Sequence, residues 1–170
     1  NTSRVTLLRN SFAFAISFTG HGVSNWDTSM VTLLTSTFYG ASAFNADLSN
    51  WDTSRVTSLD HTFAEAGSFA GDGLSNWDTS SVTHMGKTFR SATSFVGDGV
   101  SNWDTSMVTS LASTFKEETS FNANLSNWNT ARVTTLDHTF SGATSFTGDG
   151  VSNWDTSRVT HMDATFNRVN

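Results

Sequence analysis

The chain lacks cysteine, has few basic residues and has no long apolar run. Without cysteine it offers no thiolate to a metal, and its redox compartment stays open. Nine lysine and arginine residues stand against fifteen acidic residues, for a formal net charge of −6, whereas nucleic-acid binding needs clustered positive charge. No apolar stretch reaches the roughly 18 residues of a membrane-spanning helix. We therefore expect no nucleic-acid partner and no membrane insertion by this segment.

What the sequence does contain is a short repeated unit. Each copy reads close to S-N-W-D-T-S-x-V-T-x-[LM]-x-x-T-F-x-x-A-x-S-F, and its tryptophan recurs every 25 or 26 residues. Self-similarity at such a period is the signature of a repeat solenoid, whose stacked coils share one continuous core. We expect a single solenoid domain over residues 1–170, with units near 1–25, 26–50, 51–76, 77–102, 103–127, 128–153 and 154–170. Because the chain starts and stops within a unit, we interpret it as a segment of a longer repeat protein.

Local patterns predict the structure of one coil. The stretches at 48–51 and 55–57 have the β-branched and aromatic character of short strands, and Asp52, Thr53 and Ser54 between them have turn chemistry. Apolar residues at 59, 63 and 66 follow a helical spacing. Each coil of about seven is thus predicted to hold two short strands and a short helical turn, as in a β-solenoid. At about 4.8 Å per coil the rod would be about 30 Å long.

The length of the unit varies at one corner. Short units read Asn-Ala-Asp-Leu or Asn-Ala-Asn-Leu, and long units read Gly-Asp-Gly or Gly-His-Gly before Leu or Val. We interpret the extra residue as a loop whose glycines supply positive φ. A longer period also exists, because residues 24–93 match residues 101–170 at most positions, including Met30 with Met107, Arg55 with Arg132 and His84 with His161. Variable positions therefore repeat every third coil.

The run S-N-W-D-T-S-x-V-T-x-[LM]-x-x-x-F, followed by A-x-S-F-N, resembles the bacterial surface protein 26-residue repeat. That family has no characterised function and is related to leucine-rich repeats of the BspA-like kind. The resemblance covers essentially the whole chain and implies a surface-displayed, leucine-rich-repeat-like, non-enzymatic solenoid of the adhesin type, with no catalytic residues. In one column the chain departs from the family, which usually has methionine before the first phenylalanine; here the column reads Ser11, Thr37, Thr62, Thr88, Thr114, Thr139 and Thr165.

Several columns of the repeat are candidate sites. The tryptophans could form a ladder that stacks on sugar rings, but we expect them, with the two phenylalanine columns, in the core. The aspartates after tryptophan could bind calcium along the array, and Asp72, Asp98 and Asp149 in the glycine corners are better calcium candidates. We expect the first set to cap turns. Equivalent histidines lie three coils apart, and no single Ser/His/Asp set stands out, so we expect no metal, no cofactor and no enzymatic activity.

Threonine gives the candidate binding face. Two threonine rows lie four residues apart in each unit, and alternation along a strand would place both rows on one face. A flat lattice of methyl and hydroxyl groups resembles the threonine ladders of solenoid antifreeze proteins, although long side chains stand between the rows and threonine is common on exposed strands. The candidate face comprises Thr28, Thr32, Thr53, Thr57, Thr79, Thr83, Thr105, Thr109, Thr130, Thr134, Thr156 and Thr160.

Taken together, these features favour an extracellular or cell-surface module that presents a repeating polar face for adhesion, assembly or binding to a protein or glycan. The alternative is ice binding through the threonine rows.

Overall fold

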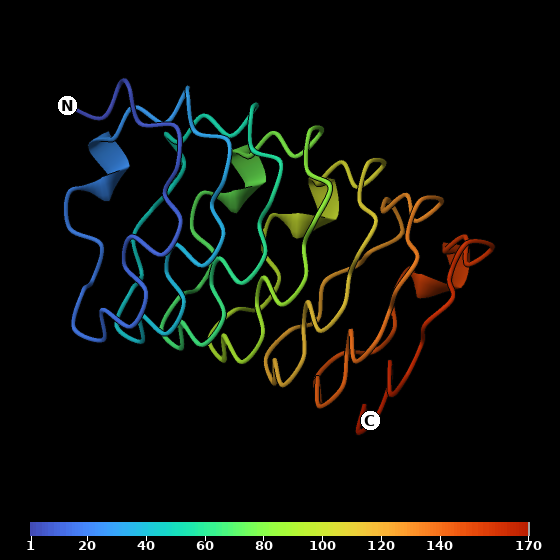
Figure 1. The fold of residues 1–170 in the computed structure, drawn as a ribbon. Coiled ribbons are helices and arrows are strands. Elements are labelled where there is room, and N and C mark those ends of the chain that lie inside the picture. The colour runs from blue at the N-terminus through green and yellow to red at the C-terminus, as the bar shows by residue number, and fades with distance from the viewer. Residues whose placement is uncertain (170) are drawn as a thin grey trace.

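The computed structural model describes residues 1–169 and shows a stack of coils with the two chain ends at opposite ends of the stack (Figure 1). Each coil meets the next through a parallel bridge at one position. The bridged partners lie 25 or 26 residues apart, so the sequence period is also the register of the stack. Bridges join Leu7, Leu33, Ser58, His84, Ser110, Thr135 and His161 in succession.

Backbone hydrogen bonds run between coils along the stretch that follows the bridge. The amides of Leu59, His61 and Phe63 donate to carbonyl oxygens one coil later, each at 2.9 Å. The intervening amide of Thr62 instead donates to Leu59 in its own coil, at 3.0 Å. His61 and Glu65 adopt positive φ values of 57° and 59°. The expected helical turn at residues 59–66 is therefore a series of tight turns, because an α-helix would use these amides internally and leave the next coil unbonded.

The expected strands are also absent from residues 1–169, apart from single bridge residues. In the four long coils, the residues just before tryptophan form a short 3-10 helix. Each begins after a glycine with φ between 86° and 91°, as the predicted loop required. These helices are η1 (Val23–Asn25), η2 (Leu74–Asn76), η3 (Val100–Asn102) and η4 (Val151–Asn153). No helix among the described residues has the length and apolar composition needed to cross a membrane.

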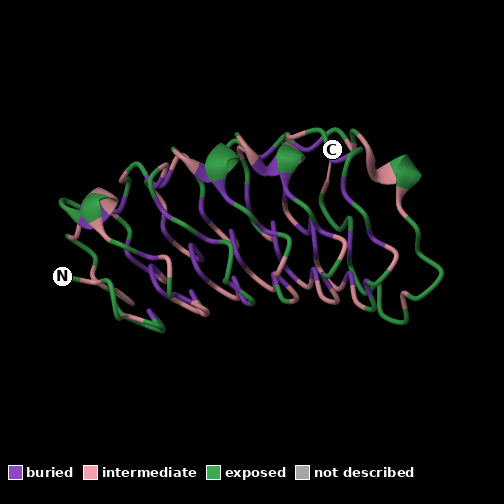
Figure 2. Ribbon diagram, turned by 90° about the horizontal axis from the view of Figure 1, so that it is seen from above, coloured by how far each residue is buried: buried purple, intermediate pink, exposed green. Residues whose placement is uncertain are grey.

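The core runs through the middle of the stack, where Figure 2 shows buried segments in every inner coil. The prediction that tryptophan, valine, leucine or methionine and both phenylalanines are buried is confirmed for the inner coils. Trp51, Trp77 and Trp103 are only 3%, 5% and 2% exposed, and Phe63 and Phe69 are fully buried. A tryptophan ladder open to sugar rings is therefore excluded in these coils.

Aromatic rings form ladders inside this core. Phe63 and Phe69 of one coil stack with their centroids 4.1 Å apart, and Phe63 stacks on Phe89 of the next coil at 5.7 Å. The indole N–H of Trp51 donates to the carbonyl oxygen of Val23, 28 residues earlier in the chain, at 2.9 Å. The indole groups of Trp77, Trp103, Trp128 and Trp154 donate in the same way, so apolar burial is combined with a polar contact between coils that satisfies the one donor of the ring.

Candidate functional site

The first threonine row, which begins with Thr28, lies inside the molecule rather than on the predicted face. Five of its six members, Thr28, Thr53, Thr79, Thr105 and Thr130, are at most 3% exposed, and only Thr156 in the last coil is exposed. The expectation that both rows share one exposed strand face is therefore wrong. A β-turn separates the rows, because the amide of Val56 donates to the carbonyl oxygen of Thr53 at 2.9 Å. Strand alternation cannot be carried across such a turn.

The buried row joins coils through its hydroxyl groups. The Thr53 hydroxyl donates to the carbonyl oxygen of Asp78 in the next coil at 3.0 Å, and the Thr79 hydroxyl makes the same bond to Asp104 at 3.0 Å. These bonds give each buried threonine hydroxyl a partner, which a buried polar group needs. This row is therefore structural.

The second threonine row lies at the surface. Thr57, Thr134 and Thr160 are exposed, and Thr32, Thr83 and Thr109 are half-buried. Each hydroxyl donates backward to the corresponding threonine carbonyl of the preceding coil, as between Thr57 and Thr32 at 3.2 Å. The hydroxyls are thus held in one orientation and can still accept hydrogen bonds. Half of the predicted face remains, as a single row.

A variable column borders this row and repeats its contacts every third coil. A guanidinium nitrogen of Arg55 lies 3.1 Å from the sulfur of Met30, and Arg132 and Met107 are also 3.1 Å apart. Both methionines are exposed, at 39% and 37%.

Two further contacts recur at the same step. The Thr83 hydroxyl lies 2.8 Å from Nδ1 of His84, as does the Thr160 hydroxyl from Nδ1 of His161. Asp60 accepts the amide of Gly86 at 2.7 Å, and Asp137 accepts that of Asp163 at 2.8 Å. We call these residues the periodic surface: Met30, Arg55, Asp60 and His84 form its first copy, and Met107, Arg132, Asp137 and His161 form its second.

Sequence patterns predicted no structural role for a third threonine column, which includes Thr62, Thr88 and Thr114. Thr62 is fully buried, and its hydroxyl lies 2.8 Å from the carbonyl oxygen of Leu59 in its own coil and 3.0 Å from that of Leu34 in the preceding coil. Thr88 and Thr114 repeat this geometry. The signal was available, because this is the column in which threonine stands where the resembled family has methionine.

The aspartates after tryptophan cap turns, as expected. The amide and hydroxyl of Ser54 both donate to one carboxylate oxygen of Asp52, at 3.0 and 2.7 Å. These hydrogen bonds, the hydroxyl first, lower the pKa of Asp52 below its ordinary value, and the equivalent serine lowers the pKa of Asp104. Among the described residues, no group of three or more histidine, aspartate or glutamate side chains converges on a point where a metal could bind. Calcium binding at Asp72, Asp98 and Asp149 thus has no converging ligand set.

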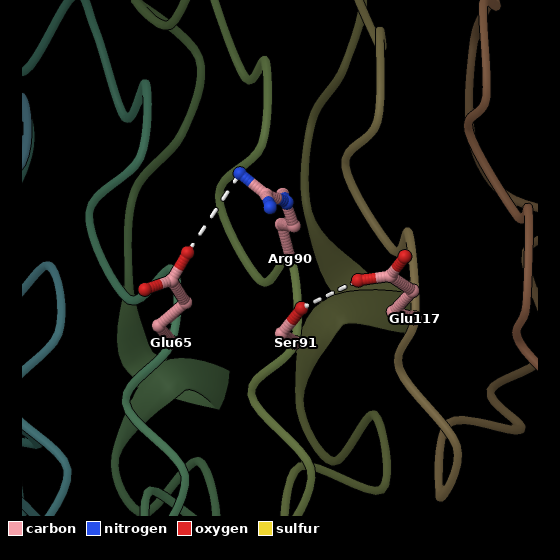
Figure 3. Close-up of polar contacts among 4 residues, drawn as sticks. All are labelled: Glu65, Arg90, Ser91 and Glu117. Carbon is pink, nitrogen blue, oxygen red and sulfur yellow. Dashed lines mark hydrogen bonds and ion pairs between the residues drawn. The ribbon is translucent and has the colours of Figure 1, made fainter.

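Charged side chains also link coils along another edge (Figure 3). Arg90 and Glu65 of adjacent coils are 3.7 Å apart, and the Ser91 hydroxyl donates to Glu117 of the following coil at 3.2 Å. Glu65 and Arg90 are about one-third exposed, so their ion pair contributes little to stability. Sequence patterns gave no indication of this edge, because its residues differ from coil to coil.

Comparison with known proteins places the chain in a family but gives it no activity. Residues 1–73 and 69–170 each match the family described as Mycoplasma protein of unknown function, DUF285. No curated protein and no solved structure matches the chain. The two matches together span the chain, so it belongs to this family of unknown function and carries its repeat in tandem.

Proposed function

We propose that this chain is a non-enzymatic repeat module, of the leucine-rich-repeat-like solenoid type, that is displayed outside the cell and binds a protein or glycan through the periodic surface. The observation that carries this proposal is the recurrence of the same side-chain contacts at a step of three coils. The contact of Met30 with Arg55 recurs between Met107 and Arg132 at the same distance. Packing inside the core does not require it, because these side chains are exposed.

The spacing suits a partner that is itself repetitive. Three coils at about 4.8 Å each place the two copies about 14 Å apart. Arg55 and Arg132 make no ion pair with any described residue, so their charges are free for a partner. Two equal sites on one rigid array strengthen each other when a partner reaches both, because the second contact forms at a high effective concentration.

The test compares single and double changes at the two arginines. Serine stands at the equivalent position of another coil, Ser81, so Arg55→Ser and Arg132→Ser preserve the fold. The probes are an array of immobilised polysaccharides and an array of extracellular proteins. We expect each single change to lower the binding affinity. The double change should lower it by a factor larger than the product of the two single factors. Arg90→Ser, which lies outside the periodic surface on the edge of the stack drawn in Figure 3, is the matched control.

Ice binding is the second candidate, favoured by the regular exposed row of threonines. Uniform hydroxyl bonds to the preceding coil hold these side chains alike, as between Thr83 and Thr57 at 3.1 Å. The row lacks the second parallel row that a flat lattice would need, since that row is buried. We therefore expect no thermal hysteresis from the unaltered chain. Clear hysteresis that Thr83→Tyr abolishes would instead establish ice binding.

A further inference from the structure

One inner coil carries a buried acid where the neighbouring coils carry alanine. Ala41, Ala66, Ala92 and Ala143 occupy this column and are fully buried. Glu118 occupies the same column in the coil at 103–127, between Ala92 and Ala143, and is also fully buried. The column is built for a methyl group, so a carboxyl group there is a local exception.

The environment of Glu118 provides almost no hydrogen bonds or opposite charges to stabilise an ionised carboxylate. One carboxyl oxygen accepts the amide of Ser120 at 3.3 Å, and the other oxygen is buried without a partner. By position in the repeat, Lys116 and Glu117 adjoin Glu118 in its own coil, and the equivalent stretch 89–95 of the preceding coil contains Arg90, which pairs with Glu65. The facing stretch 140–146 of the next coil contains no ionisable residue. A carboxylate at this position would be a buried, uncompensated charge.

We propose that Glu118 makes the coil at 103–127 a proton-controlled weak point of the stack, closed while its carboxyl group is protonated and prone to open once that group ionises. Coils of a repeat array contact mainly their neighbours, so one weakened coil separates the cooperative units on either side. Here those units are residues 1–102 and 128–169. Opening would expose Phe115 and Phe121, which are fully buried in the closed stack.

The pH range follows from the two protonation equilibria. Burial raises the pKa of Glu118 to about 8, whereas the ordinary value, expected when the coil is open, is 4.5. Between these values the closed form holds a proton that the open form has lost, so stability falls as the pH rises. The opening constant should increase about tenfold per pH unit in this range and level off above about pH 8.

Hydrogen exchange of the whole chain at pH 7 and pH 9 tests the proposal. After correction for intrinsic exchange, amides in residues 111–121 should show an opening constant about tenfold larger at pH 9 than at pH 7. The equivalent amides of residues 59–69 serve as the internal reference and should show no such increase, because their bonds to the next coil end at residues 84–90 and do not involve the coil at 103–127.

Three variants separate titration of Glu118 from a merely structural role. Glu118→Ala restores the residue of the neighbouring coils, and Glu118→Gln keeps the size without the titration, so both should abolish the tenfold increase. Glu117→Gln changes the exposed neighbour and should leave the increase intact. Equal protection of residues 111–121 at both pH values in the unaltered chain would overturn the proposal, as would an increase that persists in Glu118→Gln.

Discussion

At the scale of single residues, threonine has different structural roles at different positions in the coil. Threonine occupies three columns, and the structure buries two of them. Buried threonine hydroxyls bond to backbone carbonyls of neighbouring coils, as Thr53 does with Asp78. Threonine suits these positions because its methyl group packs in the core while its hydroxyl satisfies a carbonyl that burial removes from water.

Replacing a buried threonine should therefore be more damaging than replacing an exposed one. Thr62→Val keeps the shape of the side chain but removes the hydroxyl that lies against the carbonyls of Leu59 and Leu34. We expect a loss of about 1–2 kcal/mol in the free energy of unfolding. Thr57→Val, at the exposed row, should change it by less than about 0.5 kcal/mol. Urea unfolding measures both, and equal effects would contradict the assigned roles.

The capping aspartates give the stack a dependence on acid. Because the pKa values of Asp52 and Asp104 are lowered in the folded state, their contribution is present above the ordinary value of 3.8 and is lost as the pH falls through the folded-state value. Asparagine serves as the cap at Asn129, where its side-chain oxygen accepts the amide of Ala131 at 3.1 Å.

The variant Asp52→Asn with Asp104→Asn should therefore unfold much like the unaltered chain at pH 7 and lose less stability between pH 5 and pH 2. Thermal midpoints across this range provide the measurement. The same fall of the thermal midpoint between pH 5 and pH 2 in both proteins would show that these caps do not contribute to the acid dependence of stability.

At the scale of the element, the glycine corners decide how each long coil turns into its 3-10 helix. Gly22 and Gly73 have nearly the same backbone conformation, with φ of 88° and 91°, before η1 and η2. Their surroundings differ. A methyl group on Gly73 would collide with the backbone of Leu48 and Ser49, whereas one on Gly22 would meet nothing within 4 Å.

This pair separates backbone strain from steric collision. Gly22→Ala should cost about 1–2 kcal/mol, from the unfavourable conformation alone. Gly73→Ala adds the collision and should cost about 2–4 kcal/mol in total. Chemical denaturation of the two variants supplies the comparison. Similar losses would mean that the corner moves away from the preceding coil at little cost.

At the scale of the whole molecule, stability depends on keeping every coil in register. Deleting residues 27–103 removes one three-coil block and joins Trp26 to Asp104, which preserves the repeat. We expect a folded, shorter stack with a lower thermal midpoint, because fewer coil interfaces remain. Deleting residues 27–90 removes a non-integral number of coils and should abolish the fold.

Near-ultraviolet circular dichroism, which reports the packed tryptophans, distinguishes the two deletions. A native-like signal from the second deletion would show that the coils do not depend on a common register.

The sequence by itself determined the repeat, its register, the buried aromatic columns and the capping role of the aspartates. These follow from identity and spacing, since a residue that recurs in every coil must meet its own copies in the stack. The three-coil period is also a property of the sequence, and in the structure it becomes a set of matching contacts such as that of Met30 with Arg55.

Only the tertiary structure decided the path of the backbone within a coil and the side to which each threonine points. Local propensity predicted strands and a helical turn. Amides such as that of His61 instead donate to carbonyl oxygens of the next coil. A turn after Thr53 then reverses the alternation that placed two threonine rows on one face. The physical reason is that satisfying backbone groups across the stack outweighs local preference, and the partners in those backbone bonds lie 24 to 26 residues away.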